Sequence, residues 1–176
     1  MALGKHLGSA SIRPEGEWDR AEVHALNVAA FETPAEADLV DALRVEAKPV
    51  VSLVAEQAGL VVGHILFSPV TLSGHSGLQI MGLAPMAVAP SRQRQGIGSA
   101  LVRAGLERCR TLGAGAVVVL GHPDYYPRFG FTAAARFGIG SEYNVPEDTF
   151  MVLELEPGYL RGASGTIRYH AAFRNV

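Results

Sequence analysis

The sequence contains a single cysteine, Cys109, among its 176 residues. A lone cysteine excludes an intrachain disulfide and favours a cytoplasmic location. Its position within a helical pattern indicates packing in a core, so we do not assign it a nucleophilic role. The six histidines show neither an HxxxH pair nor a His/Cys ligand spacing, and we therefore expect no metal site.

An excess of positive charge is also missing. The 15 Lys and Arg residues are outnumbered by 17 Asp and Glu residues, which gives a formal net charge of -2. Because such a protein has no overall cationic field to attract DNA or RNA, we expect no nucleic-acid partner.

Long hydrophobic runs are absent as well. The first residues, MALGKHLGSAS, lack the apolar block of a signal peptide. The apolar run at residues 59–70 is too short to cross a bilayer, and it contains His64 and Pro69. We therefore expect no membrane association. Residues 162–165, GASG, lack the glycine spacing of a nucleophile elbow, so a hydrolase is not favoured.

The composition that remains is that of a globular protein. Hydrophobic residues make up 48% of the chain and charged residues 18%, and the length suits one domain with a buried core. We expect residues 1–9 to form a disordered N-terminal extension and residues 10–157 to form the domain. Residues 158–176 are expected to form a tail that packs on the domain or on a partner subunit, and a homodimer is one open possibility.

Periodic hydrophobicity predicts an α/β order of elements. A strand is expected at residues 10–13, a helix at 17–31, and a second helix at 34–47, where Thr33, Pro34 and Glu36 form a capping sequence. The later elements are strands 50–56 and 60–72 joined as a hairpin, strand 78–89, helix 96–112, strand 116–120, a short helix 124–129, a strand from 131, and strand 149–156. This order favours a mixed sheet with helices on both faces.

The same periodicity predicts which side of two helices faces the core. For the first helix the expected inward residues are Trp18, Ala21, Ala25, Val28 and Ala29. For the helix at 96–112 they are Leu101, Val102, Gly105, Cys109 and Leu112.

The stretch SRQRQGIGSAL, residues 91–101, lies between a strand and a helix. Glycines at a helix start expose unpaired backbone N–H groups beside the positive end of the helix dipole, which favours phosphate binding. A dinucleotide fingerprint would need a small residue in place of Leu101, and a P-loop would need Gly-Lys before Ser or Thr. The pattern that remains is Q-x-x-G-x-G, with a tight turn that binds no ligand as the alternative.

Pro85 lies inside the strand that precedes this loop. Because proline cannot donate a ladder hydrogen bond, it indicates an edge or a bulge. We expect the strand to separate from its neighbour at Pro85, which frees main-chain groups of Met86 and Val88.

Three segments together resemble one family. LAPMAV at residues 83–88, QRQGIG at 93–98 and YYPRFGF at 125–131 are similar to the bulged strand, the acetyl-CoA loop and the Tyr-x-x-x-Gly-Phe segment of the GCN5-related N-acetyltransferase (GNAT) superfamily. The longer run from residue 117 and the ending FMVLELEPGYLRGASGTIRY resemble its YhbS-type branch. The resemblance implies an α/β fold with a central, mostly antiparallel mixed sheet flanked by helices, over roughly residues 10–157.

The resemblance also implies a site and a reaction. Acetyl-CoA would be the cosubstrate, and the acetyl group would pass directly to a primary amine on a small molecule or a protein. Tyr126 is expected to act as the acid for the leaving thiolate, with packing as the alternative role. The implied cofactor-binding residues are Met86, Ala87, Val88, Gln93, Arg94, Gln95, Gly96, Ile97, Gly98 and Ser99.

The general base is the part of the pattern that this sequence does not match. Many family members carry a glutamate on the fourth strand, but residues 80–89 hold no carboxylate. Candidates by residue type are Glu32, Glu56, His64, His75 and His122, with a water chain as a further alternative. This departure motivates a second hypothesis, a non-catalytic acyl-CoA sensor or interaction module of the same fold.

Overall fold

Two neighbouring strands of the sheet are joined by a tight turn. β2 (Val51–Gln57) and β3 (Leu60–Leu72) run antiparallel, and the two residues between them, Ala58 and Gly59, have φ of 52° and 78°. Positive φ at both positions matches the right-handed twist of a hairpin. This computed structural model describes residues 8–176, so most of the expected extension at residues 1–9 lies outside the described residues.

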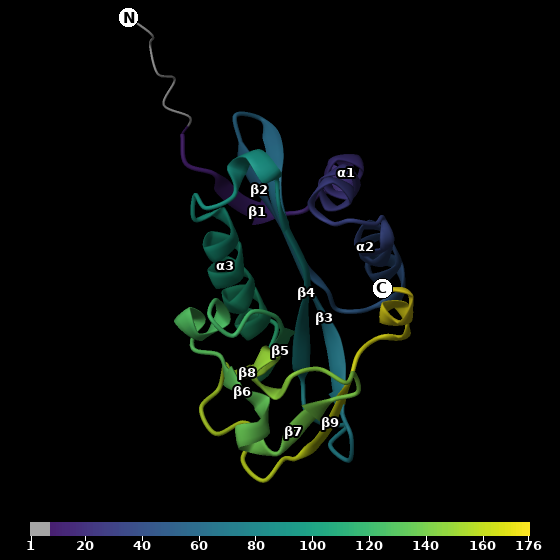
Figure 1. The fold of residues 1–176 in the computed structure, drawn as a ribbon, viewed down its shortest axis with the longest axis vertical. Helices are drawn as coiled ribbons and strands as arrows, with labels where there is room; N and C mark the ends of the chain where they lie inside the picture. The colour runs from purple at the N-terminus through teal and green to yellow at the C-terminus, as the bar shows by residue number, and fades with distance from the viewer. Residues whose placement is uncertain (1–7) are drawn as a thin grey trace, which may run out of the picture.

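The described residues form nine strands and three α-helices (Figure 1). The main sheet has the order β1-β2-β3-β4-β5-β8-β6, and β4 and β5 are its parallel pair. The expected mixed, mostly antiparallel sheet is therefore confirmed. The other bounds are β1 Ser11–Pro14, β4 Ile80–Val88, β5 Ala116–Leu120, β6 Thr132–Ala133, β7 Ile139–Ser141, β8 Phe150–Glu154, β9 Gly165–Arg168, α1 Arg20–Ala30, α2 Ala35–Glu46 and α3 Ile97–Thr111.

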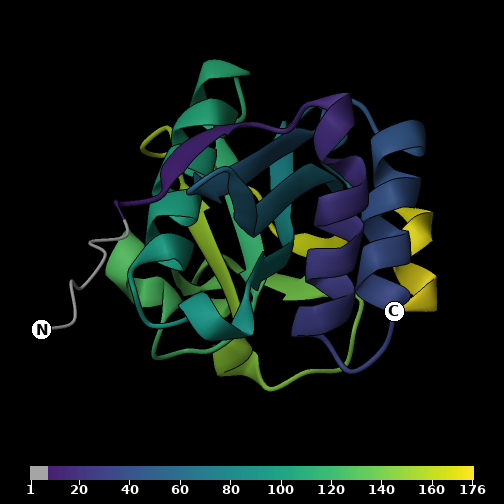
Figure 2. The ribbon, with the colours of Figure 1, turned by 90° about the horizontal axis from the view of Figure 1, so that it is seen from above.

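Helices cover both faces of the sheet. Figure 2 shows α1 and α2 on one side of the strands and α3 on the other. α3 packs on β2, β3 and β4 through buried residues such as Leu101, Val102 and Cys109. Val23, Val40 and Leu43 build a separate cluster under α1 and α2. Burial of these apolar side chains is the main force that holds the layers together.

The predicted inward face of α1 is wrong. Trp18 is 79% exposed and Val28 is 42% exposed, whereas Val23, Leu26 and Asn27 are buried. Trp18 belongs to a separate 3-10 turn, Glu17–Asp19, and the α-helix begins only at Arg20, where the larger apolar side chains Val23 and Leu26 face the sheet. On α3, Leu112 is 48% exposed and lies after the helix, while Ile97 and Leu106 join the inward stripe.

The start of α2 keeps only part of its predicted cap. Thr33 Oγ1 accepts a hydrogen bond from the Ala35 N–H at 3.3 Å. The Glu36 side chain lines the cleft described below.

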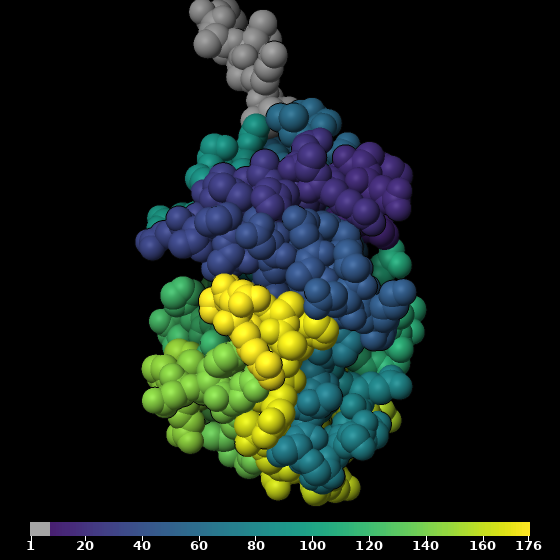
Figure 3. Space-filling view, turned by 90° about the vertical axis from the view of Figure 1, so that its right-hand side faces the viewer, coloured from purple at the N-terminus to yellow at the C-terminus, as the bar shows by residue number. Residues whose placement is uncertain are grey.

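The C-terminal segment contains β9, a strand that the sequence did not predict, and a buried residue beyond it. β9 pairs antiparallel with the end of β3, at Thr71↔Arg168 and Leu72↔Ile167, and parallel with β7. Beyond β9, Phe173 is buried in the cluster under α1 and α2. Figure 3 shows the C-terminal segment, in yellow, lying against α2, in blue. Among the described residues, no helix is long and apolar enough to cross a membrane.

Candidate functional site

The sheet opens between β4 and β5. Their pairing runs from Ile80↔Ala116 to Leu83↔Val119 and ends there, although β4 continues to Val88 beside β3. The register with β3 changes from Phe67↔Leu83 to Ile65↔Met86, so β4 carries one extra residue at Ala84–Pro85. A bulge bends its strand, and Pro85 has no N–H to pair. The separation expected at Pro85 is therefore present.

Main-chain groups of β4 point into this opening. The Ala89 N–H donates to the Val62 carbonyl at 2.8 Å, which makes Ala89 and Val62 a hydrogen-bonded pair of the antiparallel ladder. Because such pairs alternate along a ladder, Ala87 also bonds toward β3, whereas Met86 and Val88 direct their main-chain groups away from it. The Val88 carbonyl accepts a hydrogen bond from Gln93 Nε2 at 3.2 Å. The N–H of Val88 and both main-chain groups of Met86 face the gap.

The loop before α3 presents a second set of donors. Arg94 and Gly96 have φ of 62° and 82°, and α3 begins directly after them. The Ala100 N–H donates to the Gly96 carbonyl at 3.0 Å, so the N–H groups of Ile97, Gly98 and Ser99 precede the helical ladder. Together with the helix dipole they form an anion-binding end.

A single cleft joins these features. Its volume is about 1260 Å³, and its lining runs from the loop along β4 to the tyrosine segment after β5. Of the eleven site residues expected from sequence, the cleft brings together nine, namely Met86, Val88, Gln93, Arg94, Gly96, Ile97, Gly98, Ser99 and Tyr126. Ala87 is buried and bonds toward β3, and Gln95 is exposed outside the lining.

Tyr126 lies at the first position of a 3-10 turn, Tyr126–Phe129, and is 8% exposed. Its ring packs on Gly121, where an added Cβ would collide with the ring, and edge-on against Phe131 at 5.7 Å between centroids. Burial, with a smaller effect of Tyr125, raises the pKa of Tyr126 to about 12. The hydroxyl is therefore protonated at neutral pH.

The base candidates chosen by residue type are mostly elsewhere. Only His122 lines the cleft. His64 is fully buried and bonds Ser52 Oγ at 2.8 Å. Glu56 pairs with Arg13 at 2.7 Å, and His75 accepts a long hydrogen bond from the Ser164 N–H at 3.5 Å. Glu32 is exposed outside the lining.

Sequence reasoning missed Glu36. This residue lines the cleft, and its Oε2 is shielded from solvent without a hydrogen-bond partner in the described part of the chain. In the sequence, Glu36 is explained as part of the capping sequence of α2. Nothing in the pattern indicates that it also lines a cleft.

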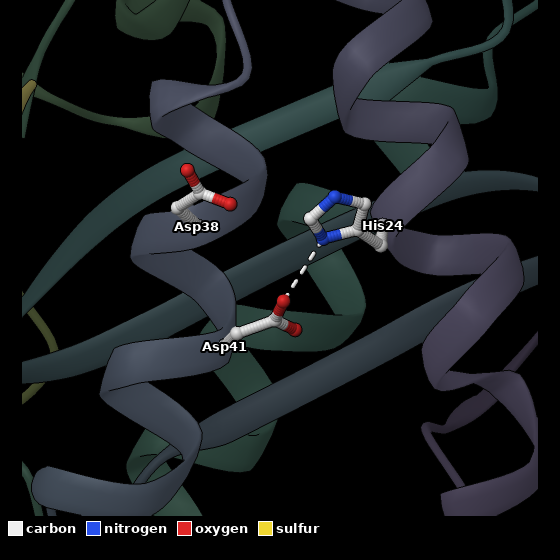
Figure 4. Close-up of side chains that lie close together, drawn as sticks. All are labelled: His24, Asp38 and Asp41. Atoms are coloured by element: carbon white, nitrogen blue, oxygen red, sulfur yellow. Dashed lines mark hydrogen bonds and ion pairs between the residues drawn. The ribbon is translucent and has the colours of Figure 1, made fainter.

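A second group of ionisable side chains lies between α1 and α2 (Figure 4). His24 Nδ1 is 2.9 Å from Asp41 Oδ2, and Asp38 lies beside them. Arg44 Nη1 contacts the other Asp41 oxygen at 2.7 Å. Because both Asp41 oxygens are engaged by the helices themselves, the group serves to tie α1 to α2.

Comparisons with known proteins agree with this geometry. The model of the acetyltransferase (GNAT) family matches residues 17–131. The uncharacterized N-acetyltransferase YhbS of Escherichia coli K12 is 39% identical over 163 residues, which cover 92% of this chain and 97% of YhbS. The uncharacterized N-acetyltransferase YjhQ of the same strain is 41% identical over 134 residues, 74% of each protein.

Solved structures match over nearly the whole chain. The crystal structure of E. coli YhbS in complex with CoA has a TM-score of 0.89 at 37% identity and covers 99% of this chain and 96% of its own. A GNAT family acetyltransferase from Brucella melitensis in complex with acetyl-CoA has a TM-score of 0.77 at 39% identity, over 93% and 97% of the two chains. The expected fold and the resemblance to the YhbS-type branch are confirmed. This chain belongs to the acetyltransferase (GNAT) family.

Proposed function

We propose that this protein is an acetyl-CoA-dependent N-acetyltransferase that transfers the acetyl group directly to a primary amine of a small molecule or a protein. One observation carries the proposal: a single cleft connects the free amides at the start of α3, the separated part of β4 and Tyr126 in the turn after β5. The matching structures of YhbS and of the Brucella protein hold CoA and acetyl-CoA, which supports the same cosubstrate here.

The residues of the cleft fit coenzyme A in two places. The N–H groups of Ile97, Gly98 and Ser99 suit a pyrophosphate, with Arg94 adding positive charge. The main-chain groups of Met86 and Val88 suit the amides of an extended pantetheine arm, which would pair with β4 as an added strand does.

Bound acetyl-CoA supplies a thioester whose carbonyl carbon bonds to the amine nitrogen while its carbon–sulfur bond breaks. The role of β4 is to hold an N–H near the carbonyl oxygen, where negative charge grows. The role of Tyr126 is to donate its hydroxyl proton toward the departing sulfur.

The pKa of Tyr126 refines that role. A free thiol has a reference pKa of about 8.5, well below the raised pKa of Tyr126, so complete proton transfer from Tyr126 to the sulfur is unfavourable. Tyr126 therefore acts mainly as a hydrogen-bond donor that stabilises the thiolate, and the proton that the amine loses neutralises the sulfur through solvent.

Direct transfer of the acetyl group, without an acetyl-enzyme, agrees with the burial of Cys109. Cys109 is fully buried in the core, outside the lining of the cleft, and burial raises the pKa of its thiol to about 12. Such a thiol is neither accessible nor ionised, so it does not form an acetyl-enzyme. A single unpaired cysteine also supports a reducing, cytoplasmic location as part of the proposal.

The C-terminal residues belong to this proposal because Tyr169 and Phe173 line the same cleft. We assign residues 10–157 to the transferase domain and residues 158–176 to a segment that completes its acceptor side.

The test is calorimetric titration with acetyl-CoA followed by a panel of primary amines, with free thiol and product mass as readouts. We expect saturable binding and an acetylated amine matched by released CoA. Binding of acetyl-CoA without thiol release from any amine would favour the non-catalytic sensor, and absence of binding at millimolar ligand would reject both.

A further inference from the structure

The cleft has a second half that coenzyme A does not account for. It is formed by the start of α2, the loop before β8 and the C-terminal segment, which are far apart in sequence. Its lining consists of Phe31, Glu36, Leu39, Tyr143, Val145, Tyr169 and Phe173. Among the described lining residues of the whole cleft, Glu36 has the only acidic side chain.

Three of the four aromatic residues of this half, Tyr143, Tyr169 and Phe173, form a continuous wall. The ring centroids of Tyr143 and Tyr169 are 5.8 Å apart, and those of Tyr169 and Phe173 are 5.1 Å apart. The Tyr169 N–H donates to Glu142 Oε1 at 3.1 Å, which fastens the loop before β8 to the C-terminal segment. Such a wall offers apolar area for a ligand and ring faces that attract an organic cation.

Glu36 lies in the first turn of α2, on the cleft side of that helix. Its Oε2 is shielded from solvent, yet no donor of the described residues bonds it. A shielded carboxylate oxygen without a donor is unfavourable, and a cationic ligand removes that cost. The terminal torsion of glutamate is broad, so the carboxylate can turn an oxygen to the cleft without a rotamer change.

Glu36 shares the cleft with the bulge of β4. Ala84, at the bulge of β4, packs against the cluster that includes Leu39 and Val40 of α2. Pro85, the next residue, lines the cleft together with Glu36. The bulge is where β4 separates from β5, and the proposed function places the thioester beside it.

We propose that Glu36 binds the ammonium group of the acceptor, and that the acceptor carries an apolar body that lies against Tyr143, Tyr169 and Phe173. This inference rests on the proposed function and names the acceptor class: a primary ammonium on an apolar or aromatic body. A small aryl-alkyl amine and the N-terminus of a peptide with an apolar first residue share this chemistry.

The first experiment measures binding without chemistry. Phenethylamine has the ammonium group and the ring, and in the absence of acetyl-CoA it cannot react, so calorimetry reports the site alone. Glu36→Gln keeps the shape of the side chain and removes its charge, and we expect it to weaken this binding about 10- to 100-fold, the range for a hydrogen-bonded or paired charge. Affinity for acetyl-CoA should stay unchanged. Glu46→Gln, on the exposed last turn of α2, makes the same charge change outside the cleft and should alter neither affinity.

The second experiment measures turnover with three acceptors. Phenethylamine tests the small-amine source, Phe-Gly-Gly-amide tests the peptide source, and 2-aminoethanol lacks an apolar body. We expect one of the first two to have the lowest KM, and Glu36→Gln to raise that KM about 10-fold or more. A KM for 2-aminoethanol below those of the other two acceptors would contradict the proposed role of the aromatic wall in acceptor binding.

The outcomes separate this inference from the function beneath it. An active acetyltransferase in which Glu36→Gln changes neither cation binding nor KM would reject the role of Glu36 and leave the function intact. Glu36-dependent binding of phenethylamine by a protein that releases no thiol would reject the function and keep the cation site.

Discussion

The hydroxyl of Tyr125 lies 3.2 Å from Ser99 Oγ, so the tyrosine segment after β5 touches the first turn of α3. The Arg128 guanidinium carbon stacks over the Tyr125 ring, 4.4 Å from its centroid. The Tyr126 ring packs edge-on against the Tyr125 ring, with 5.1 Å between centroids. The Tyr125 side chain therefore connects the proposed phosphate loop to Tyr126. The two parts of the site are fixed relative to one another by this contact.

Loss of that contact should affect cofactor binding more than chemistry. In Tyr125→Phe the ring packing stays and the hydroxyl bond to Ser99 is lost, which is worth about 1 kcal/mol. We expect the KM for acetyl-CoA to rise about 5-fold while kcat stays within 2-fold of wild type, as measured by steady-state thiol release. A large fall in kcat at unchanged KM would assign the chemistry to Tyr125.

Tyr126→Phe should have the opposite signature. The ring still fills its place against Gly121 and Phe131, but the donor for the leaving sulfur is lost. We expect turnover to fall ~10²-fold or more, the scale for loss of one hydrogen-bond donor to a developing negative charge, with acetyl-CoA affinity roughly intact. Unchanged turnover would leave Tyr126 with a packing role only.

The pH dependence of turnover follows from the pKa of Tyr126. Burial raises this pKa to about 12, so the donor form is fully present below that value and is lost only as pH rises through it. We expect no loss of turnover from Tyr126 ionisation up to pH 10. A basic limb with a midpoint near 9 that disappears in Tyr126→Phe would contradict this assignment.

Gly96 is the loop position where the backbone demands glycine. Its φ is 82°, and no atom lies within 4 Å of a Cβ built there, so the effect of an alanine is on the backbone alone. Gly96→Ala should cost about 1–2 kcal/mol in unfolding free energy and weaken acetyl-CoA binding, because the loop relaxes away from its donor geometry. Denaturant unfolding and calorimetry measure the two effects.

Gly140→Ala is the matched control. Gly140 lies in β7, away from the cleft, with equally open space around a Cβ. Both measurements should stay at wild-type values. An equal loss in the two variants would show that the strain at Gly96 has no special importance.

A buried carboxylate should make stability depend on acid pH. Burial alone would raise the pKa of Glu15, but hydrogen bonds from His64, Arg44 and Ser52 outweigh it and lower the pKa to about 2. Because the folded pKa lies below the unfolded value of 4.5, this stabilisation is present above about pH 5 and is lost as pH falls toward 2. The difference corresponds to about 3 kcal/mol of unfolding free energy.

Urea unfolding between pH 2 and pH 7 tests this prediction. Glu15→Gln should be less stable than wild type at pH 7, since it leaves Arg44 and His64 without their buried partner, and its stability should fall less on acidification. Parallel pH curves for the two proteins would contradict the lowered pKa of Glu15.

The parts of the site that depend on local backbone chemistry could be predicted from sequence. Pro85 cannot donate in a ladder, and glycines before a helix expose its first amides, so the bulge and the loop follow from a few residues each. The error at Trp18 has a local cause as well: this residue belongs to the 3-10 turn at Glu17–Asp19 and not to α1.

The second half of the cleft, where we propose that the acceptor binds, depends on contacts between segments far apart in sequence. The periodicity of hydrophobic residues carries no information about such contacts. β9 reaches β3 across almost a hundred residues, and Tyr169 meets Tyr143 only because of that pairing. Glu36 has an ordinary place in a capping sequence, and only the assembled fold shows that it lines the cleft.

The central claim is acetyl transfer through the cleft between α3 and the tyrosine segment. Its most direct measurement is the release of CoA from acetyl-CoA in the presence of phenethylamine, with the product identified by mass spectrometry, for wild type and Tyr126→Phe. The account predicts one acetylated amine for each CoA released by the wild type and a rate ~10²-fold lower in the variant. Equal rates in the two proteins, or CoA release without acetylated amine, would contradict it.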